Sequence, residues 1–63
     1  MMYIVVFFEE YVGYHFDEYS RAFNSLVKAD KYCHKLNDEF AEVNNCSVED
    51  LGDYYVIEQI EVE

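Results

Sequence analysis

The pattern of hydrophobic and polar positions predicts two strands near the start of the chain. Residues 3–8, Tyr-Ile-Val-Val-Phe-Phe, are β-branched or aromatic at every position, which is typical of a strand buried on both faces. We therefore expect a first strand over about residues 2–9. Gly13 is the early turn signal. A second strand over about residues 18–23 should return beside the first and close a hairpin.

Hydrophobic residues then recur at spacings of three and four, which predicts an amphipathic helix over about residues 26–43. Asn24 or Ser25 can cap its first turn, because their side-chain oxygens accept hydrogen bonds from free backbone N–H groups. Asn44 and Asn45 can end it in a left-handed turn. The hydrophobic stripe consists of Leu26, Ala29, Cys33, Leu36, Phe40 and Val43.

The last hydrophobic segment, residues 54–62, predicts a third strand with Val56, Ile60 and Val62 on one face. The element order is then strand, strand, helix, strand. We predict a single α+β domain of ββαβ type over residues 1–63, with one helix packed on a three-stranded, mainly antiparallel sheet. The pattern leaves open which strand is central.

A rival interpretation of the middle of the chain also stays open. Phe16, Tyr19 and Phe23 continue the helical stripe backward from Leu26. Residues 17–25 can therefore form either the second strand or an N-terminal extension that gives one long helix over residues 17–43.

The predicted sheet has more hydrophobic surface than one helix can cover. The first strand carries hydrophobic residues on both faces, and one helix covers one face. The chain also has seven tyrosines, a residue type enriched at protein interfaces. We therefore expect a homodimer or a partner contact, or else a loop over residues 44–53 that folds across the face. The residues assigned to the contact are Tyr3, Val5, Phe7, Tyr55 and Ile57.

The charge of the chain narrows the class of partner. The formal net charge is −10 over 63 residues, with a pI near 4.3. Nucleic acids and anionic membranes would repel such a chain, so we expect no direct contact with either. A partner protein with a basic surface fits the charge, and so does simple solubility. No hydrophobic run is long enough to span a bilayer, and we expect a cytoplasmic protein.

The charges are also unevenly distributed. The four basic residues all lie between Arg21 and Lys35, and every acidic residue except Asp30 lies outside that segment. Lys28 would lie near the positive end of the predicted helix and Glu42 near its negative end, against the helix dipole. This layout is either tolerated because exposed charges are screened, or kept for a partner. The predicted acidic patch comprises Asp38, Glu39, Glu42, Glu49, Asp50, Asp53, Glu58 and Glu61.

The side chains that could take part in catalysis or bind a metal form no recognised motif. Cys33, His34, Cys46 and His15 are ligand types for soft metals, but no pair has the usual short spacing. Cys33 lies on the hydrophobic stripe, where burial should raise its thiol pKa and oppose a nucleophilic role. Adjacent carboxylates recur along the chain without the spacing of a calcium loop. We predict no enzyme, no metal and no cofactor.

Three segments resemble small, largely uncharacterised proteins encoded by phages and prophages. These segments are the opening Tyr3-Ile4-Val5-Val6 with Glu9-Glu10-Tyr11, the stretch Phe23-Asn24-Ser25 leading into Ala29 and Tyr32, and the closing Tyr54-Tyr55-Val56-Ile57-Glu58. The resemblance covers nearly the whole chain. It implies a ββαβ fold and a viral context, and it implies no reaction and no functional residues.

Charge and resemblance together lead to two functional hypotheses. The first is a phage-encoded inhibitor of a host nucleic-acid-handling or defence protein, of anti-CRISPR or anti-restriction type, working in the host cytoplasm. It would act as a DNA mimic, because carboxylates on alternate strand residues such as Glu61 and Glu63 stand about 6.5–7 Å apart, close to the spacing of phosphates. The alternative is a small structural or accessory protein that homodimerises through its aromatic sheet face.

Overall fold

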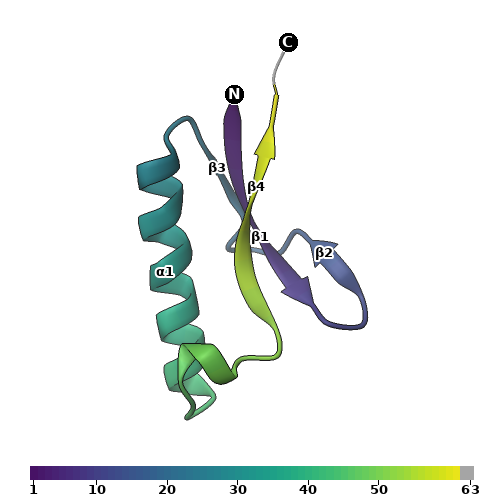
Figure 1. The fold of residues 1–63 in the computed structure, drawn as a ribbon, viewed down its shortest axis with the longest axis vertical. Coiled ribbons are helices and arrows are strands. Elements are labelled where there is room, and N and C mark those ends of the chain that lie inside the picture. The colour runs from purple at the N-terminus through teal and green to yellow at the C-terminus, as the bar shows by residue number, and fades with distance from the viewer. Residues whose placement is uncertain (62–63) are drawn as a thin grey trace.

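The computed structural model describes residues 1–61 and shows one helix packed on an antiparallel sheet of four strands (Figure 1). The fold class is therefore α+β, as predicted. Figure 1 also shows that α1 ends far from the start of β1 and the end of β4, which lie side by side because Met2 is opposite Ile60. The elements in chain order are β1 (Met2–Glu9), β2 (Gly13–His15), β3 (Arg21–Phe23), α1 (Leu26–Val43), the short 3-10 helix η1 (Val48–Asp50) and β4 (Tyr54–Ile60).

Strand β1 is the centre of the sheet. On one side it pairs with β4 in an unbroken register that runs from Met2 opposite Ile60 to Phe8 opposite Tyr54. On its other side it pairs with two short strands, β2 beside its C-terminal half and β3 beside its N-terminal half. Residues directly opposite each other lie on the same face of a sheet. This register therefore determines the composition of both faces.

The predicted second strand over residues 18–23 is partly wrong, because the strand that returns along β1 is interrupted. Residues 16–20 separate β2 from β3 and lie opposite only Val6. A local turn makes the interruption. Asp17 Oδ1 accepts a hydrogen bond from the backbone N–H two residues later at 2.8 Å, and the Asp17 N–H donates to Ser20 Oγ at 3.0 Å. Such side-chain bonds to the backbone compete with strand pairing.

Helix α1 spans the same residues as the predicted helix. Ser25 caps it, since its Oγ accepts from the Lys28 N–H at 3.4 Å, and Asn45 leaves it in a left-handed conformation with φ of 56°. The alternative of one helix over residues 17–43 is wrong, because β3 pairs with β1 and the cap fixes the helix start. No helix in residues 1–61 is both long and hydrophobic enough to cross a membrane.

The core lies between α1 and one side of the sheet, which we call the covered face. Val5 and Ala29 are fully buried, and the small Ala29 side chain lets the helix approach the sheet closely. Full burial of a side chain such as Val5 contributes about 1.5–3 kcal/mol. The rest of the buried cluster is Cys33, Leu36 and Tyr55, and the partly buried residues that pack against it are Tyr3, Phe7, Phe23, Tyr32 and Ile57.

Asn37 fastens α1 to the outer edge of β4. Its Oδ1 accepts from the backbone N–H of Tyr55 at 2.7 Å, and its Nδ2 donates to the Tyr55 carbonyl oxygen at 3.0 Å. These are the two backbone groups that a neighbouring antiparallel strand would use. The carboxamide of Asn37 therefore takes the place of a further strand at this point of the sheet.

Residues 44–53 do not fold across the sheet, so that predicted alternative is wrong. η1 contacts α1, and Asp53 Oδ1 accepts from the backbone N–H of Glu10 at 3.2 Å, which ties the segment to the turn between β1 and β2. The predicted last strand ended at residue 62, whereas β4 ends at Ile60 and Val62 lies outside the described residues.

Candidate binding surface

The sheet face turned away from α1, which we call the open face, is hydrophobic. The register places the even-numbered residues of β1 and β4 on it, together with one residue each from β2 and β3. Among residues 1–61, no helix lies over this face (Figure 1). Its members are Met2, Ile4, Val6, Phe8, Tyr14, Ala22, Tyr54, Val56, Glu58 and Ile60.

The predicted contact residues are on the wrong face. Tyr3, Val5, Phe7, Tyr55 and Ile57 belong to the core or pack against it under α1. The face that is free for a partner is the opposite one. The error has a physical cause, because β1 carries two hydrophobic sets of similar size and the strand period cannot show which set the helix will cover.

Aromatic side chains are unusually exposed on and beside the open face. Tyr14 is 62% exposed and Phe16, in the interruption between β2 and β3, is 70% exposed. The Phe8 ring contacts those of Tyr14 and Tyr54, with centroids 5.1 and 5.4 Å apart. Clustered exposed aromatic side chains of this kind make the open face a candidate binding surface. The sequence did not assign Phe16 to the contact, because its spacing from Tyr19 and Phe23 pointed to a helical stripe and not to a turn beside the sheet.

The structure separates the predicted acidic residues into two groups. The larger group, which we call the acidic end, lies on the second half of α1, on η1 and just before β4, at the end of the molecule away from the start of β1 and the end of β4 (Figure 1). Along an extended strand, Glu58 and Glu61 are roughly 16 and 26 Å from Asp53. Glu63, used in the phosphate-spacing prediction, lies outside the described residues. The acidic end comprises Asp38, Glu39, Glu42, Glu49, Asp50 and Asp53.

Two members of the acidic end also have structural roles that the sequence did not reveal. Asp50 Oδ2 accepts from the Ser47 hydroxyl at 2.9 Å within the turn of η1, and Asp53 accepts from the Glu10 backbone N–H. The other four carboxylates make no hydrogen bond to another described residue. Those four are the freer candidates for contact with a partner.

The acidic end opposes the electrostatics of α1. The first turn of the helix contains no acidic residue and its last turn no basic one, the reverse of what the helix dipole favours. Within residues 1–61, no lysine or arginine lies within 4.0 Å of a carboxylate. Within the described residues, the carboxylates of the acidic end are therefore not paired with a lysine or arginine.

The thiol and imidazole groups do not converge. Cys33 is buried and its Sγ donates to the Tyr55 carbonyl oxygen at 3.2 Å, whereas Cys46 is exposed. Burial, with a smaller contribution from the Asp30 carboxylate, raises the pKa of the Cys33 thiol. Across residues 1–61, no three histidine, cysteine or acidic side chains lie close enough to hold a metal ion.

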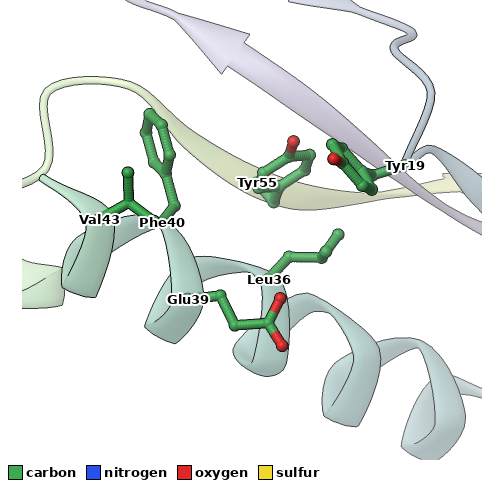
Figure 2. Close-up of a pocket in the computed structure, with 6 residues that line it drawn as sticks. All are labelled: Tyr19, Leu36, Glu39, Phe40, Val43 and Tyr55. Carbon is green, nitrogen blue, oxygen red and sulfur yellow. The ribbon is translucent and has the colours of Figure 1, made fainter.

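A shallow pocket of about 190 Å³ lies between α1 and the turn at residues 16–20 (Figure 2). Figure 2 shows side chains of α1 directed toward Tyr55 on β4, with Tyr19 beside it. The pocket has one carboxylate, that of Glu39, so it lacks the carboxyl pair that acid–base hydrolysis uses. Its lining is Tyr19, Leu36, Glu39, Phe40, Val43 and Tyr55.

The hydroxyl of Tyr55, a residue that lines this pocket, makes a hydrogen bond to the neighbouring turn. It donates to Asp17 Oδ2 at 2.7 Å, which joins β4 to the interruption between β2 and β3. Burial, followed by the bond to Asp17, raises the pKa of Tyr55 well above its ordinary value. The pKa of Tyr19 is also raised, chiefly by the neighbouring carboxylate of Glu18. The Tyr55 hydroxyl holds the turn through Asp17, and both phenols stay protonated at neutral pH.

Comparison with protein-family models, with curated proteins and with solved structures gave no match. The resemblance to phage proteins and the expected absence of enzyme activity therefore stay predictions. The candidate surface rests on the geometry of this chain alone.

Proposed function

We propose that the protein is a non-enzymatic binding protein for a partner protein with a basic surface. The observation that carries the proposal is a hydrophobic sheet face that no helix covers within the described residues, on a chain of net charge −10. Tyr14, Phe16 and Ile60 on and beside this face are exposed, although Val6 at its centre is buried. Such a face favours contact with a macromolecule, and the charge favours a basic one and speeds the encounter by electrostatic steering.

The finer form of the proposal is inhibition by nucleic-acid mimicry. The carboxylates of the acidic end would occupy the groove of a nucleic-acid-handling protein in place of phosphates, as a phage-type inhibitor would. The absence of neutralising lysine or arginine at the acidic end, within the described residues, supports this form. So does a charge layout that helix stability alone would not favour.

The test uses a variant in which three exposed acids of the acidic end without structural hydrogen bonds are reversed: Asp38→Lys, Glu42→Lys and Glu49→Lys. Wild-type and variant proteins are immobilised, incubated with bacterial lysate at low salt, and eluted with a salt gradient into a mass spectrometer. We expect the wild type to retain nucleic-acid-binding proteins that elute at moderate salt or on addition of duplex DNA, because both weaken ionic contacts. The variant should retain few of them.

The matched control reverses three exposed acids elsewhere, Glu10, Glu18 and Glu61, and changes the net charge by the same amount. Retention by this control with loss in the acidic-end variant supports mimicry. Equal retention by both variants, or no release by duplex DNA, rejects it. The predicted homodimer through the sheet face is checked by sedimentation of the free protein.

A further inference from the structure

The open face contains a recess of about 250 Å³, located where the strand pairing is interrupted. Its floor is hydrophobic and formed by neighbouring positions of β1 and β4, namely Ile4, Val6 and Ile60. Tyr14 and Phe16 line the recess at the interrupted edge. The recess therefore exists because residues 16–20 leave the sheet, which puts an aromatic ring beside the floor in place of a strand residue.

One carboxylate, that of Glu58, lines the recess. Its cross-strand neighbour is Ile4, and Glu58 is partly buried. His15 also lines the recess. Its Nε2 lies 3.4 Å from a carboxylate oxygen of Glu9, so the imidazole is directed to an acid other than Glu58. No lysine or arginine of the described residues lines the recess. Glu58 is thus an acid on a hydrophobic surface without a cation beside it, and covering it with a purely hydrophobic partner would be costly.

We propose that this recess receives an arginine side chain of the partner protein, an inference that rests on the proposed binding function. The aliphatic stem of an arginine can lie on the hydrophobic floor while its guanidinium binds Glu58 through two parallel N–H donors. Its planar face can also stack on the Tyr14 or Phe16 ring. A lysine offers a single rotating ammonium group and no planar face, so it satisfies fewer of these features.

A second copy of this chain does not supply the required group. The chain has one arginine, Arg21, which lies opposite Val5 and therefore on the covered side, with its guanidinium 5.6 Å from the Tyr32 ring centroid. The three lysines lie on α1, across the sheet from the recess. Packing two open faces together would bury two Glu58 carboxylates without a cation. The observations therefore favour a different, arginine-bearing protein as the occupant.

The experiment titrates the 63-residue chain, followed by NMR, with a blocked pentapeptide that carries arginine between leucines. The matched ligand has citrulline in place of arginine, which keeps the shape and removes the charge. We expect the arginine peptide to shift the methyl signals of Ile4, Val6 and Ile60 and to bind at least about tenfold more tightly than the citrulline peptide.

The variant Glu58→Gln should lose about tenfold in affinity for the arginine peptide. Glu61→Gln, which removes a charge just beyond the recess, should bind like the wild type. Phe16→Ala is a second variant that keeps the charge and removes the stacking ring, and it should also bind more weakly. Equal binding of the two peptides, or equal loss in the Glu58 and Glu61 variants, would overturn the inference. So would a dimer in which the recess methyl groups are protected from both peptides.

The outcome is separable from that of the proposed function. The triple variant of the acidic end should still bind the arginine peptide, since Asp38, Glu42 and Glu49 do not line the recess. If the recess prefers arginine but no basic partner is captured from lysate, the mimicry proposal fails alone. If partners are captured and neither peptide binds, the recess inference fails alone.

Discussion

The two faces of the sheet are chemically alike but differ in what they do. Both are made mainly of valine, isoleucine, phenylalanine and tyrosine from the same two long strands. On the covered face, Val5 and Tyr55 are buried under α1. On the open face, Tyr54 and Ile60 are 37% and 42% exposed. The covered face is the main core, whereas the open face buries Val6 and presents several side chains of the same kind to solvent.

The difference shows that hydrophobic content alone does not assign a residue to folding or to binding. Polar contacts distinguish the faces more clearly. The covered side has the Asn37 bonds to β4 and the bond from Tyr55 to Asp17, whereas the carboxylate of Glu58 on the open side makes no hydrogen bond to another described residue. The polar groups on the covered side are bonded within the protein, whereas the carboxylate of Glu58 is open to solvent.

The largest expected difference between the faces comes from placing an amide on each. Val5→Asn should cost about 3 kcal/mol or more, because Val5 is fully buried and the new amide would have no partner. Ile60→Asn on the open face should cost less than about 1 kcal/mol. Urea unfolding followed by circular dichroism measures both. Similar losses for the two variants would mean that the open face is buried in the free protein.

Two neighbouring tyrosines provide a finer comparison. Tyr55→Phe should lower the free energy of unfolding by about 1–2 kcal/mol, because it removes the hydrogen bond to Asp17. Tyr54→Phe should change it by less than about 0.5 kcal/mol. The two changes remove the same hydroxyl oxygen from opposite faces of the sheet. The difference between their losses in unfolding free energy therefore measures how much the surroundings of the hydroxyl matter.

The same pair of variants has a distinct pH dependence. Because the folded state raises the pKa of Tyr55, the unfolded chain loses its phenolic proton first, near pH 10. The stability that Tyr55 contributes is complete below about pH 10 and decreases as the pH rises above it. Urea unfolding between about pH 9 and pH 11 should therefore show a shallower decline for Tyr55→Phe than for Tyr54→Phe. Parallel declines would show that Tyr55 ionises normally.

The smallest expected effect concerns the acidic end. Glu42→Lys should stabilise the protein by about 0.3–1 kcal/mol at low salt, because a cation then faces the negative end of α1. Glu61→Lys makes the same change in net charge away from the helix and is the control. Thermal unfolding at low and high salt gives the comparison. If the two variants are equally stabilised, the gain comes from net charge alone.

The sequence predicted the long elements well, because their signals are local. The spacing of three and four gave α1 with its bounds, and Ser25 was one of the two predicted caps. The continuous hydrophobic run gave β1. The short strands were not resolved, since the Asp17 turn competes with pairing along β1 and its outcome depends on hydrogen bonds that residue types alone do not specify.

The candidate site was less predictable, because it depends on which face the helix covers. The period of two correctly separated the residues of β1 into two sets, but the contact was assigned to the set that includes Val5. The acidic residues were correctly recognised as a feature, yet Glu58 proved to lie on the open face and apart from the acidic end. The recess needs Phe16 and Ile60, which lie far apart along the chain.

The carboxamide of Asn37 has a consequence for how other chains can approach. An exposed edge strand invites strand addition, domain swapping and fibril growth. Asn37 already occupies the outward backbone groups of Tyr55, so along β4 only the outward groups near Ile57 and Gln59 remain, too few for a stable added strand. On the β4 side of the sheet, Asn37 therefore limits the length over which another strand could pair.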